Sequence, residues 1–173
     1  MNNSISKGQT LLRLENELTQ FKVPQLFVFE ADKFSLDPEY VFKQILNRFK
    51  GCLVVVRSSA ADEDGSSTAM AGEYESVLNV ASDDQAAVDS AIKVVIASYE
   101  CKRVLQGGDE VIVQEMVLNT SMSGVVFTHD LNTGAPYYVI NYDDVSGLTN
   151  TVTSGGGEYA NRTLYIHRGA TQV

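Results

Sequence analysis

The sequence predicts an α+β protein with a mixed or antiparallel sheet and flanking helices. Three observations carry this prediction. In the first part of the chain, segments with the apolar spacing of amphipathic helices alternate with short runs of β-branched residues. After residue 108, strand-like runs follow one another with turn residues between them. Helices interleaved with strands and then strands in succession are typical of the α+β class.

The bulk composition is that of a soluble globular protein. The 173 residues are 44% hydrophobic and 20% charged, which suits a single domain over 1–173 or two sub-lobes, 1–108 and 109–173. A formal net charge of -9 argues against general binding to nucleic acid or to anionic membranes. The sequence lacks a membrane-spanning run and a signal-peptide pattern, so we expect a cytoplasmic protein without a membrane partner. Cys52 and Cys101 have no metal-site spacing, and we expect two buried free thiols.

The first predicted helix runs from about residue 8 to residue 21. Ser6 and Gln9 have capping-box spacing, and leucines then recur on one face. This assignment places Lys7 at the helix start, where a positive charge is unfavourable for the helix dipole. A solvated lysine is nevertheless the commoner outcome at such a position.

Two further helices have comparable start and stop signals. Asp37 and Pro38 suit an N-cap and first turn, and Gly51 ends that helix. Ser82 and Gln85 have capping-box spacing for a third helix, which we expect to end near 107–108.

The predicted strands are short and rich in β-branched or aromatic residues. They are Leu26–Phe29, Leu53–Val56, Glu75–Val80, Glu110–Val117, a hairpin of Ser123–Thr128 and Tyr137–Tyr142 around the turn 132–134, and Thr163–His167.

The stretch 53–72 is the most informative part of the chain. Its buried strand delivers Arg57 into a long loop of hydroxyls, small residues and glycines, including Thr68 and Gly72. Glycine allows backbone N–H groups to approach an anion closely, and arginine supplies a fixed charged fork, so the loop suits phosphate. The alternative is a surface loop in which Arg57 is solvated or paired with Asp62 or Glu63.

Several segments together resemble the N-terminal ATP-binding domain of the phosphoenolpyruvate synthase and pyruvate phosphate dikinase family, which has an ATP-grasp-like fold. The motifs occur in family order and span nearly the whole chain. They are Ser6-Lys7-Gly8 with Leu11, the stretch 54–60 (VVVRSSA), the stretch 71–80 (AGEYESVLNV), the stretch 113–117 (VQEMV) and the stretch 123–130 (SGVVFTHD).

The resemblance implies that ATP is the ligand and assigns roles to particular residues. Lys7 and Arg57 would bind the phosphates and serve catalysis, and the backbone of the stretch 114–117 would face adenine. For Gln114 and Met116, ordinary strand packing is the competing interpretation. The residues implied in nucleotide binding are Lys7, Arg57, Ser58, Ser59, Thr68, Gly72, Gln114, Glu115, Met116 and Val117.

The resemblance also implies magnesium, which prefers hard oxygen ligands and usually takes one or two carboxylates. Asp143 and Asp144 follow a predicted strand where the family carries an acidic residue. Asn141 is a further candidate because the alignment can slip there, and an exposed acidic turn is the competing interpretation.

The sequence departs from the family pattern in ways that affect the substrate. His129 and Leu131 replace the usual arginine and proline, and the stretch 146–155 resembles a branch found with surface-polysaccharide genes, which includes a glutamine kinase. The phosphoryl acceptor would then be a small molecule, either pyruvate-like or a glutamine amide.

Such enzymes carry a separate phosphohistidine domain, and neither His129 nor His167 has its "TxH"-like setting. We therefore expect a piece of a longer, multidomain phosphotransferase that is inactive by itself. An incomplete sheet leaves unpaired edges, so the piece is also expected to form homodimers. The rival hypotheses are a nucleotide-sensing or partner-binding module without catalysis, and an ATP-grasp ligase.

Overall fold

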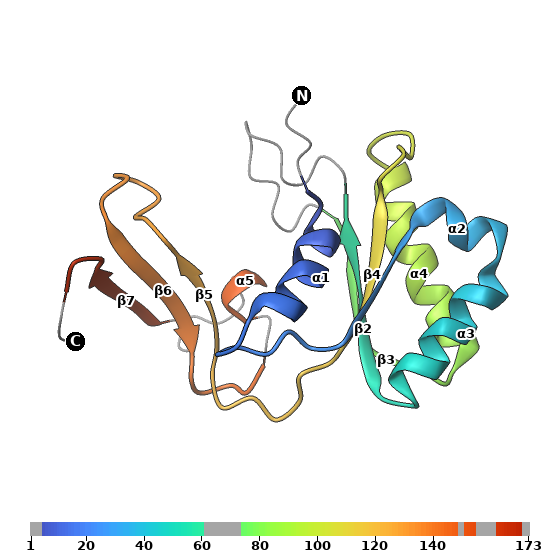
Figure 1. The fold of residues 1–173 in the computed structure, drawn as a ribbon, viewed down its shortest axis with the longest axis horizontal. Coiled ribbons are helices and arrows are strands. Elements are labelled where there is room, and N and C mark those ends of the chain that lie inside the picture. Colours follow the sequence, from blue (N-terminus) through green and yellow to red (C-terminus); the bar gives the residue numbers. More distant parts are fainter. Residues whose placement is uncertain (1–4, 61–73, 149–150, 155–161, 171–173) are drawn as a thin grey trace. The chain divides into compact units, whose positions relative to one another are not determined.

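The computed structural model describes residues 5–60, 74–148, 151–154 and 162–170 (Figure 1). Contacts divide the chain into two units, Met1–Met116 and Val117–Val173. The boundary follows Met116, whereas the sequence predicted a single domain or two sub-lobes divided after residue 108. It lies there because the strand at 110–115 pairs on both sides with strands of the first unit.

The first unit contains a four-stranded sheet in the order β1-β4-β2-β3, and all of its strand pairs are antiparallel. The α+β class is confirmed. The elements are α1 (Lys7–Glu17), β1 (Leu26–Glu30), α2 (Ala31–Leu36), α3 (Pro38–Phe49), β2 (Leu53–Ser59), β3 (Ser76–Ala81), α4 (Gln85–Glu100) and β4 (Glu110–Glu115).

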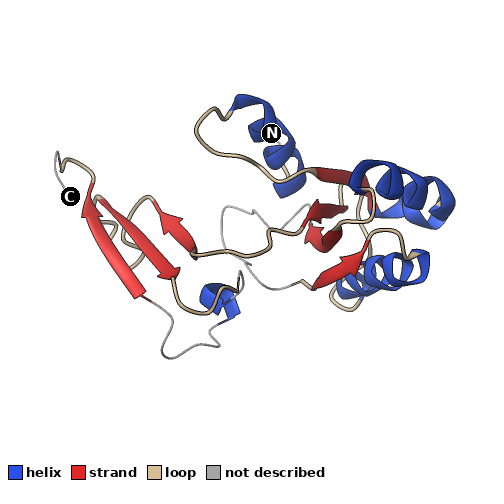
Figure 2. Ribbon diagram, turned by 90° about the horizontal axis from the view of Figure 1, so that it is seen from below, coloured by secondary structure: helices blue, strands red, loops and turns tan. Residues whose placement is uncertain are grey.

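The two faces of this sheet are covered differently. Helices α2, α3 and α4 lie on one face, and α1 lies on the other (Figures 1 and 2). The main core fills the space between the sheet and α2 to α4, with Ile45, Val56, Ile92 and Val113 among its fully buried side chains. Burial of apolar surface, at about 25 cal/mol per Å², holds these layers together. The α1 face is more polar and carries the candidate site.

Several helix boundaries differ from the expected ones. Helix α1 ends at Glu17 instead of residue 21, because its buried contact is at Gly8 while Leu18 and Phe21 are exposed. The N-cap of α4 is Asp84 and not Ser82, since the Asp84 carboxylate accepts from two backbone N–H groups of the first turn.

The Ser82 hydroxyl instead accepts from the Gly51 N–H. Helix α4 also ends earlier than expected, at Glu100. The short helix α2 follows β1 directly and was not predicted, because no separate capping signal precedes it.

The polar residues at the end of β2 belong to the strand, so the prediction that Arg57 enters a loop is wrong. Arg57, Ser58 and Ser59 stand opposite Ile112, Val111 and Glu110 of β4. Backbone hydrogen bonds between two strands do not depend on side-chain polarity, so this inner strand continues through its polar residues. The end of the apolar run in the sequence therefore does not mark the end of the strand.

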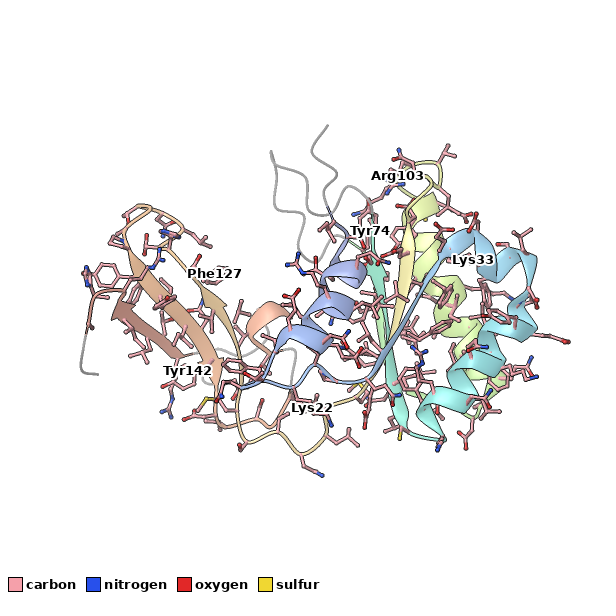
Figure 3. The ribbon with its side chains drawn as sticks, in the orientation of Figure 1. Lys22, Lys33, Tyr74, Arg103, Phe127 and Tyr142 are labelled. Carbon is pink, nitrogen blue, oxygen red and sulfur yellow. The ribbon has the colours of Figure 1, made fainter. Side chains whose placement is uncertain are left out.

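The chain between α4 and β4 is closed by a buried ion pair. Arg103 lies just after α4 (Figure 3), and both of its terminal nitrogens reach the Asp109 carboxylate at 2.7 Å. The same carboxylate accepts from the Gln106 N–H. This turn fixes the point at which β4 starts.

The second unit is built on a three-stranded antiparallel sheet in the order β5-β6-β7. The expected hairpin is confirmed by the pairing of its first two strands, which carry Phe127 and Tyr142 (Figure 3). The elements are β5 (Ser123–Phe127), β6 (Tyr137–Asp143), α5 (Thr151–Ser154) and β7 (Arg162–His167).

Cys52 and Cys101 are free thiols, but both are exposed, so the expected burial is wrong. Cys52 lies in the tight turn before β2, and Cys101 caps the end of α4, where neither side chain enters the core. Within the described ranges, the helices are too short or too polar to cross a membrane.

Candidate functional site

The alternation of side chains along β2 separates core residues from site residues. Val54 and Val56 belong to the core on the helix-covered face. Arg57 and Ser59 therefore point to the opposite face, and the Ser59 hydroxyl accepts from the Gly8 N–H of α1 at 2.9 Å. Arg57 thus lies on the same face of the sheet as the start of α1.

Arg57 is half-buried and meets a polar neighbour from β4. Its Nη1 lies 3.4 Å from Oε1 of Gln114, whose amide nitrogen donates to the Pro24 carbonyl at 3.2 Å. The Gln114 amide is therefore held with its oxygen toward the guanidinium. A guanidinium has five N–H donors, and the contact with Gln114 uses one of its nitrogens, so the other N–H groups can donate to an anion.

The first turn of α1 is fixed on this face by a buried carboxylate. Glu110 Oε2 accepts from the Ser6 hydroxyl at 2.6 Å and from the Ser59 hydroxyl at 3.3 Å, and its Oε1 accepts from Gln9 Nε2 at 2.7 Å. Ser6 is also the N-cap of α1, as its spacing to Gln9 predicts, and accepts from the Gln9 N–H. Lys7, the first residue of the helix, therefore has a defined position on the α1 face.

Tyr99 supports the same strand ends from the helix-covered side. Its hydroxyl accepts from the Ser59 N–H at 2.8 Å and donates to the Glu110 carbonyl at 2.6 Å. The backbones of Ser59 and Glu110 are thus held from the core, while their side chains hold α1.

Gly8 permits the close approach of α1 to the sheet. A Cβ atom at this position would lie 2.7 Å from Glu110 Oε2 and 2.7 Å from Val28 Cγ1. The first atom is tied by hydrogen bonds, and the second belongs to a stiff β-branched side chain, so neither yields cheaply.

We expect Gly8→Ala to lower the free energy of unfolding by about 1–3 kcal/mol, because the helix must move off the sheet. Chemical denaturation measures this loss. Gly107→Ala is the matched control, since no atom lies within 4 Å of its added Cβ. Equal stability of the two variants would show that α1 does not depend on this contact.

The segment expected to face adenine lies at the end of β4. The Glu115 N–H donates to the Gln25 carbonyl and the Met116 N–H donates to the Leu53 carbonyl, both at 2.9 Å. These two donors are therefore used within the sheet. Val117 is half exposed and stands just after the strand, which leaves it as the residue of this segment best placed to present its backbone.

The remaining predicted binding residues are placed differently. Ser58 is 3% exposed and points to the helix-covered face, away from Arg57. The Ser59 hydroxyl is occupied by α1 and Glu110. Thr68 and Gly72 lie outside the described residues. The structure therefore brings Lys7, Arg57 and Gln114 to one face and gives Ser59 an anchoring role.

An open cavity of about 620 Å³ lies elsewhere in the first unit, beside the end of α3. Its lining includes the cations Arg48 and Lys50 together with Gln25 and Glu115. Arg48 donates to the Leu26 carbonyl at 2.8 Å and lies over the Phe27 ring. Arg48 thus has a structural role at this cavity.

Asp143, the first predicted metal ligand, closes a turn in the second unit. Its Oδ1 accepts from the Val145 and Ser146 N–H groups, and its Oδ2 accepts from the Ser146 and Thr151 hydroxyls. A carboxylate has about four acceptor positions, and all of them are used here.

Asp144 forms an ion pair with Arg162, with 3.2 Å between Nη1 and Oδ2. Among the described residues, His, Cys, Asp and Glu side chains form no group of three or more that could hold a metal ion. Asp143 does not fit magnesium in this arrangement, and the metal role of the two aspartates stays a prediction.

The hydrogen bonds to Asp143 predict a pH effect on stability. Donation from the Ser146 and Thr151 hydroxyls, and then from backbone N–H groups, holds the pKa of this carboxyl well below its usual value of 3.8. A lowered pKa in the folded state means that the stabilisation is complete well above pH 4 and is lost as the pH falls below about 4.

Asp143→Asn should therefore be less stable than the parent near pH 7, with a difference that shrinks on acidification. Unfolding measured from pH 7 to pH 2 tests this expectation. A difference that does not change with pH would contradict it.

Glu110 and Tyr99 support the site, and the sequence did not predict this role for either residue. Glu110 was expected only as part of a strand, and Tyr99 lies within the third predicted helix. A signal for Glu110 was present, since it directly precedes a run of three buried apolar residues and a buried carboxylate requires partners. The partners, however, lie 104 and 51 residues away in the chain.

A family model described as "Pyruvate phosphate dikinase, AMP/ATP-binding domain" matches residues 29–169. The match covers the end of β1 and all elements from α2 to β7, including Arg57 and Gln114. The chain belongs to this family. Lys7 precedes the matched range, so the match does not bear on its predicted role and that role stays a prediction.

One curated protein is similar to this chain over part of its length. The prodigiosin synthesizing transferase PigC of Serratia marcescens is 32% identical over 112 residues, and the match covers 61% of this chain and 12% of that protein. The chain thus spans a small part of the length of this relative.

Proposed function

We propose that this chain binds ATP on the α1 face of its first sheet and serves as the nucleotide-binding part of a multidomain phosphotransferase. One observation carries the proposal. Within a member of an ATP-binding family, Arg57 and Gln114 share a face with the anchored start of α1, where Lys7 lies.

The side chains on this face suit a polyphosphate. Arg57 offers a planar fork of N–H donors, and Lys7 adds a compact positive charge at the end of a flexible stem. Phosphoryl transfer depends mainly on positioning and charge neutralisation, which these two residue types supply. Because the chain carries a net charge of -9, the attraction for the nucleotide has to be local. The resemblance implies an ATP-grasp-like binding mode, in which the backbone at the end of β4 would face the adenine.

The proposed reaction has two transfers. A P–O bond of ATP breaks as a P–N bond forms to a histidine imidazole on a separate domain, and the shortened nucleotide leaves with the electron pair. The P–N bond then breaks as the phosphoryl group bonds to an oxygen or amide nitrogen of a small acceptor. A pyruvate-like acid and a glutamine amide are the two acceptors that we propose to test. We propose a cytoplasmic location for both steps.

A second candidate function, a nucleotide-sensing or partner-binding module, is favoured by the environment of His129. The histidine occupies the position of the arginine usual in the family, and its Nε2 lies 3.0 Å from Arg168 Nη1 in the second unit. This contact ties the hairpin to the residue that follows β7 and so engages His129 within the second unit. Such a module would bind nucleotide without phosphoryl exchange in the longest natural protein that contains the chain.

Calorimetric titration with a non-hydrolysable ATP analogue, with and without Mg²⁺, tests the proposed function. We expect saturable binding to the folded chain and tighter binding with Mg²⁺, with GTP analogue as the control for base recognition. A folded chain that binds no ATP analogue in either condition would contradict the proposal. Isotope exchange between ATP and its product in the complete protein separates the catalytic role from the sensing role.

A further inference from the structure

The ATP-binding role proposed for the α1 face does not explain why a buried carboxylate, Glu110, lies on this face. It is 8% exposed and lies at the start of β4, beneath the first turn of α1. It accepts hydrogen bonds from three side chains, on α1, on its N-cap and on β2. A buried carboxylate is costly to desolvate, so a position that retains one calls for a reason beyond packing.

Hydrogen bonds that lead to Glu110 hold the residues immediately before and after Lys7. The preceding residue, Ser6, donates its hydroxyl to Glu110 at 2.6 Å. The following residue, Gly8, donates its N–H to the Ser59 hydroxyl, which in turn donates to the same Glu110 oxygen. The backbone at Lys7 is therefore held at both neighbours by one carboxylate, directly on one side and through Ser59 on the other.

The same network links Lys7 to Arg57. Ser59 and Arg57 point to one face of β2 and are two residues apart, a spacing of about 7 Å along a strand. Because Glu110 fixes Ser6, Gly8 and Ser59 together, it fixes the separation between the backbone origins of the two cationic side chains. Preorganised charges bind a polyphosphate more tightly than charges that must be ordered during binding.

We infer that Glu110 is a positioning residue that sets the start of α1 so that Lys7 and Arg57 engage one polyphosphate together. The inference rests on the proposed ATP-binding function and adds the residue that organises the site. Glu110 itself does not touch the nucleotide in this arrangement. A negative charge beside an anion-binding site is tolerated here because its acceptor positions are turned to Ser6, Gln9 and Ser59.

Glu110→Gln tests the inference with little change in volume. One carboxylate oxygen is replaced by an amide NH₂ group, which is a donor. This group can no longer accept a hydrogen bond from Gln9 Nε2 or from the two serine hydroxyls. We expect the affinity for the ATP analogue to fall roughly tenfold in the parent and to change less than about twofold in a Lys7→Ala background. Glu30→Gln is the matched control, because Glu30 stands opposite Glu110 on β1 but is exposed.

The double-mutant cycle distinguishes positioning from general destabilisation, since a loss of fold would weaken binding equally in both backgrounds. Ser6→Ala, which removes one contact on the surface side, supplies a milder variant should Glu110→Gln fail to fold. It should weaken binding in the parent by a few-fold, and not in Lys7→Ala. Thermal unfolding of each variant confirms that folded protein is compared.

The outcomes separate this inference from the function on which it rests. A Lys7→Ala variant with undiminished affinity would overturn the phosphate role of Lys7 and this inference with it. A clear loss in Lys7→Ala together with equal effects of Glu110→Gln in both backgrounds would overturn only the inference. Coupling between Glu110 and Lys7 that is absent for Glu30 supports it.

Discussion

Arg57→Ala is expected to weaken binding of an ATP analogue roughly a hundredfold, which corresponds to about 2.7 kcal/mol. The guanidinium is half-buried and braced by Gln114, so its loss removes charge-assisted hydrogen bonds that solvent does not readily replace. Truncation also leaves the Gln114 oxygen without this partner. Calorimetric titration in the presence of Mg²⁺ measures the change.

Two controls sharpen the Arg57 result. Arg57→Lys keeps the charge but loses the planar fork, and we expect an intermediate loss of roughly tenfold. Arg13→Ala removes an exposed arginine of α1 that pairs with Glu17, and it should leave affinity unchanged. An Arg57→Ala variant that binds as tightly as the parent would place the phosphates away from this face.

Asp109→Ala is expected to produce a large loss of stability, about 3 kcal/mol. Asp109 is 1% exposed and Arg103 is 17% exposed, so the ion pair is largely removed from water. Removing one partner leaves the guanidinium without its bidentate acceptor and opens the turn that starts β4. Urea denaturation of the folded chain measures the effect.

An exposed ion pair of equal length provides the comparison. Lys93 and Asp89 on α4 are 2.7 Å apart but well exposed, and Asp89→Ala should cost less than about 0.5 kcal/mol. Similar losses of unfolding free energy for Asp89→Ala and Asp109→Ala would show that burial does not determine how much the Arg103–Asp109 pair contributes to stability.

Most of the secondary structure could be predicted from the sequence because its signals are local. Asp37 and Pro38 mark the start of α3 correctly, and the alternating runs of the second unit give its hairpin. The failures occur where tertiary contacts outweigh local signals. β2 continues through its polar end because β4 pairs with it, and α1 stops early because the sheet holds only its first turn.

The candidate site could be predicted only in part. The motif around Arg57 draws attention to the residue, but its spatial neighbour Gln114 depends on the order of strands in the sheet. Ser58 and Ser59 are adjacent in sequence, and strand alternation sends them to opposite faces. The role of Glu110 depends on hydrogen-bond partners that are far away in the chain, so no local pattern reveals it.

The most direct test of the proposed site is to map the nucleotide on the folded chain by NMR chemical-shift changes during titration with a non-hydrolysable ATP analogue. We predict that the largest changes fall on the α1 face, at Lys7, Arg57 and Gln114. Changes confined to the cavity beside α3, around Arg48 and Lys50, would contradict the account, because that cavity opens elsewhere in the first unit.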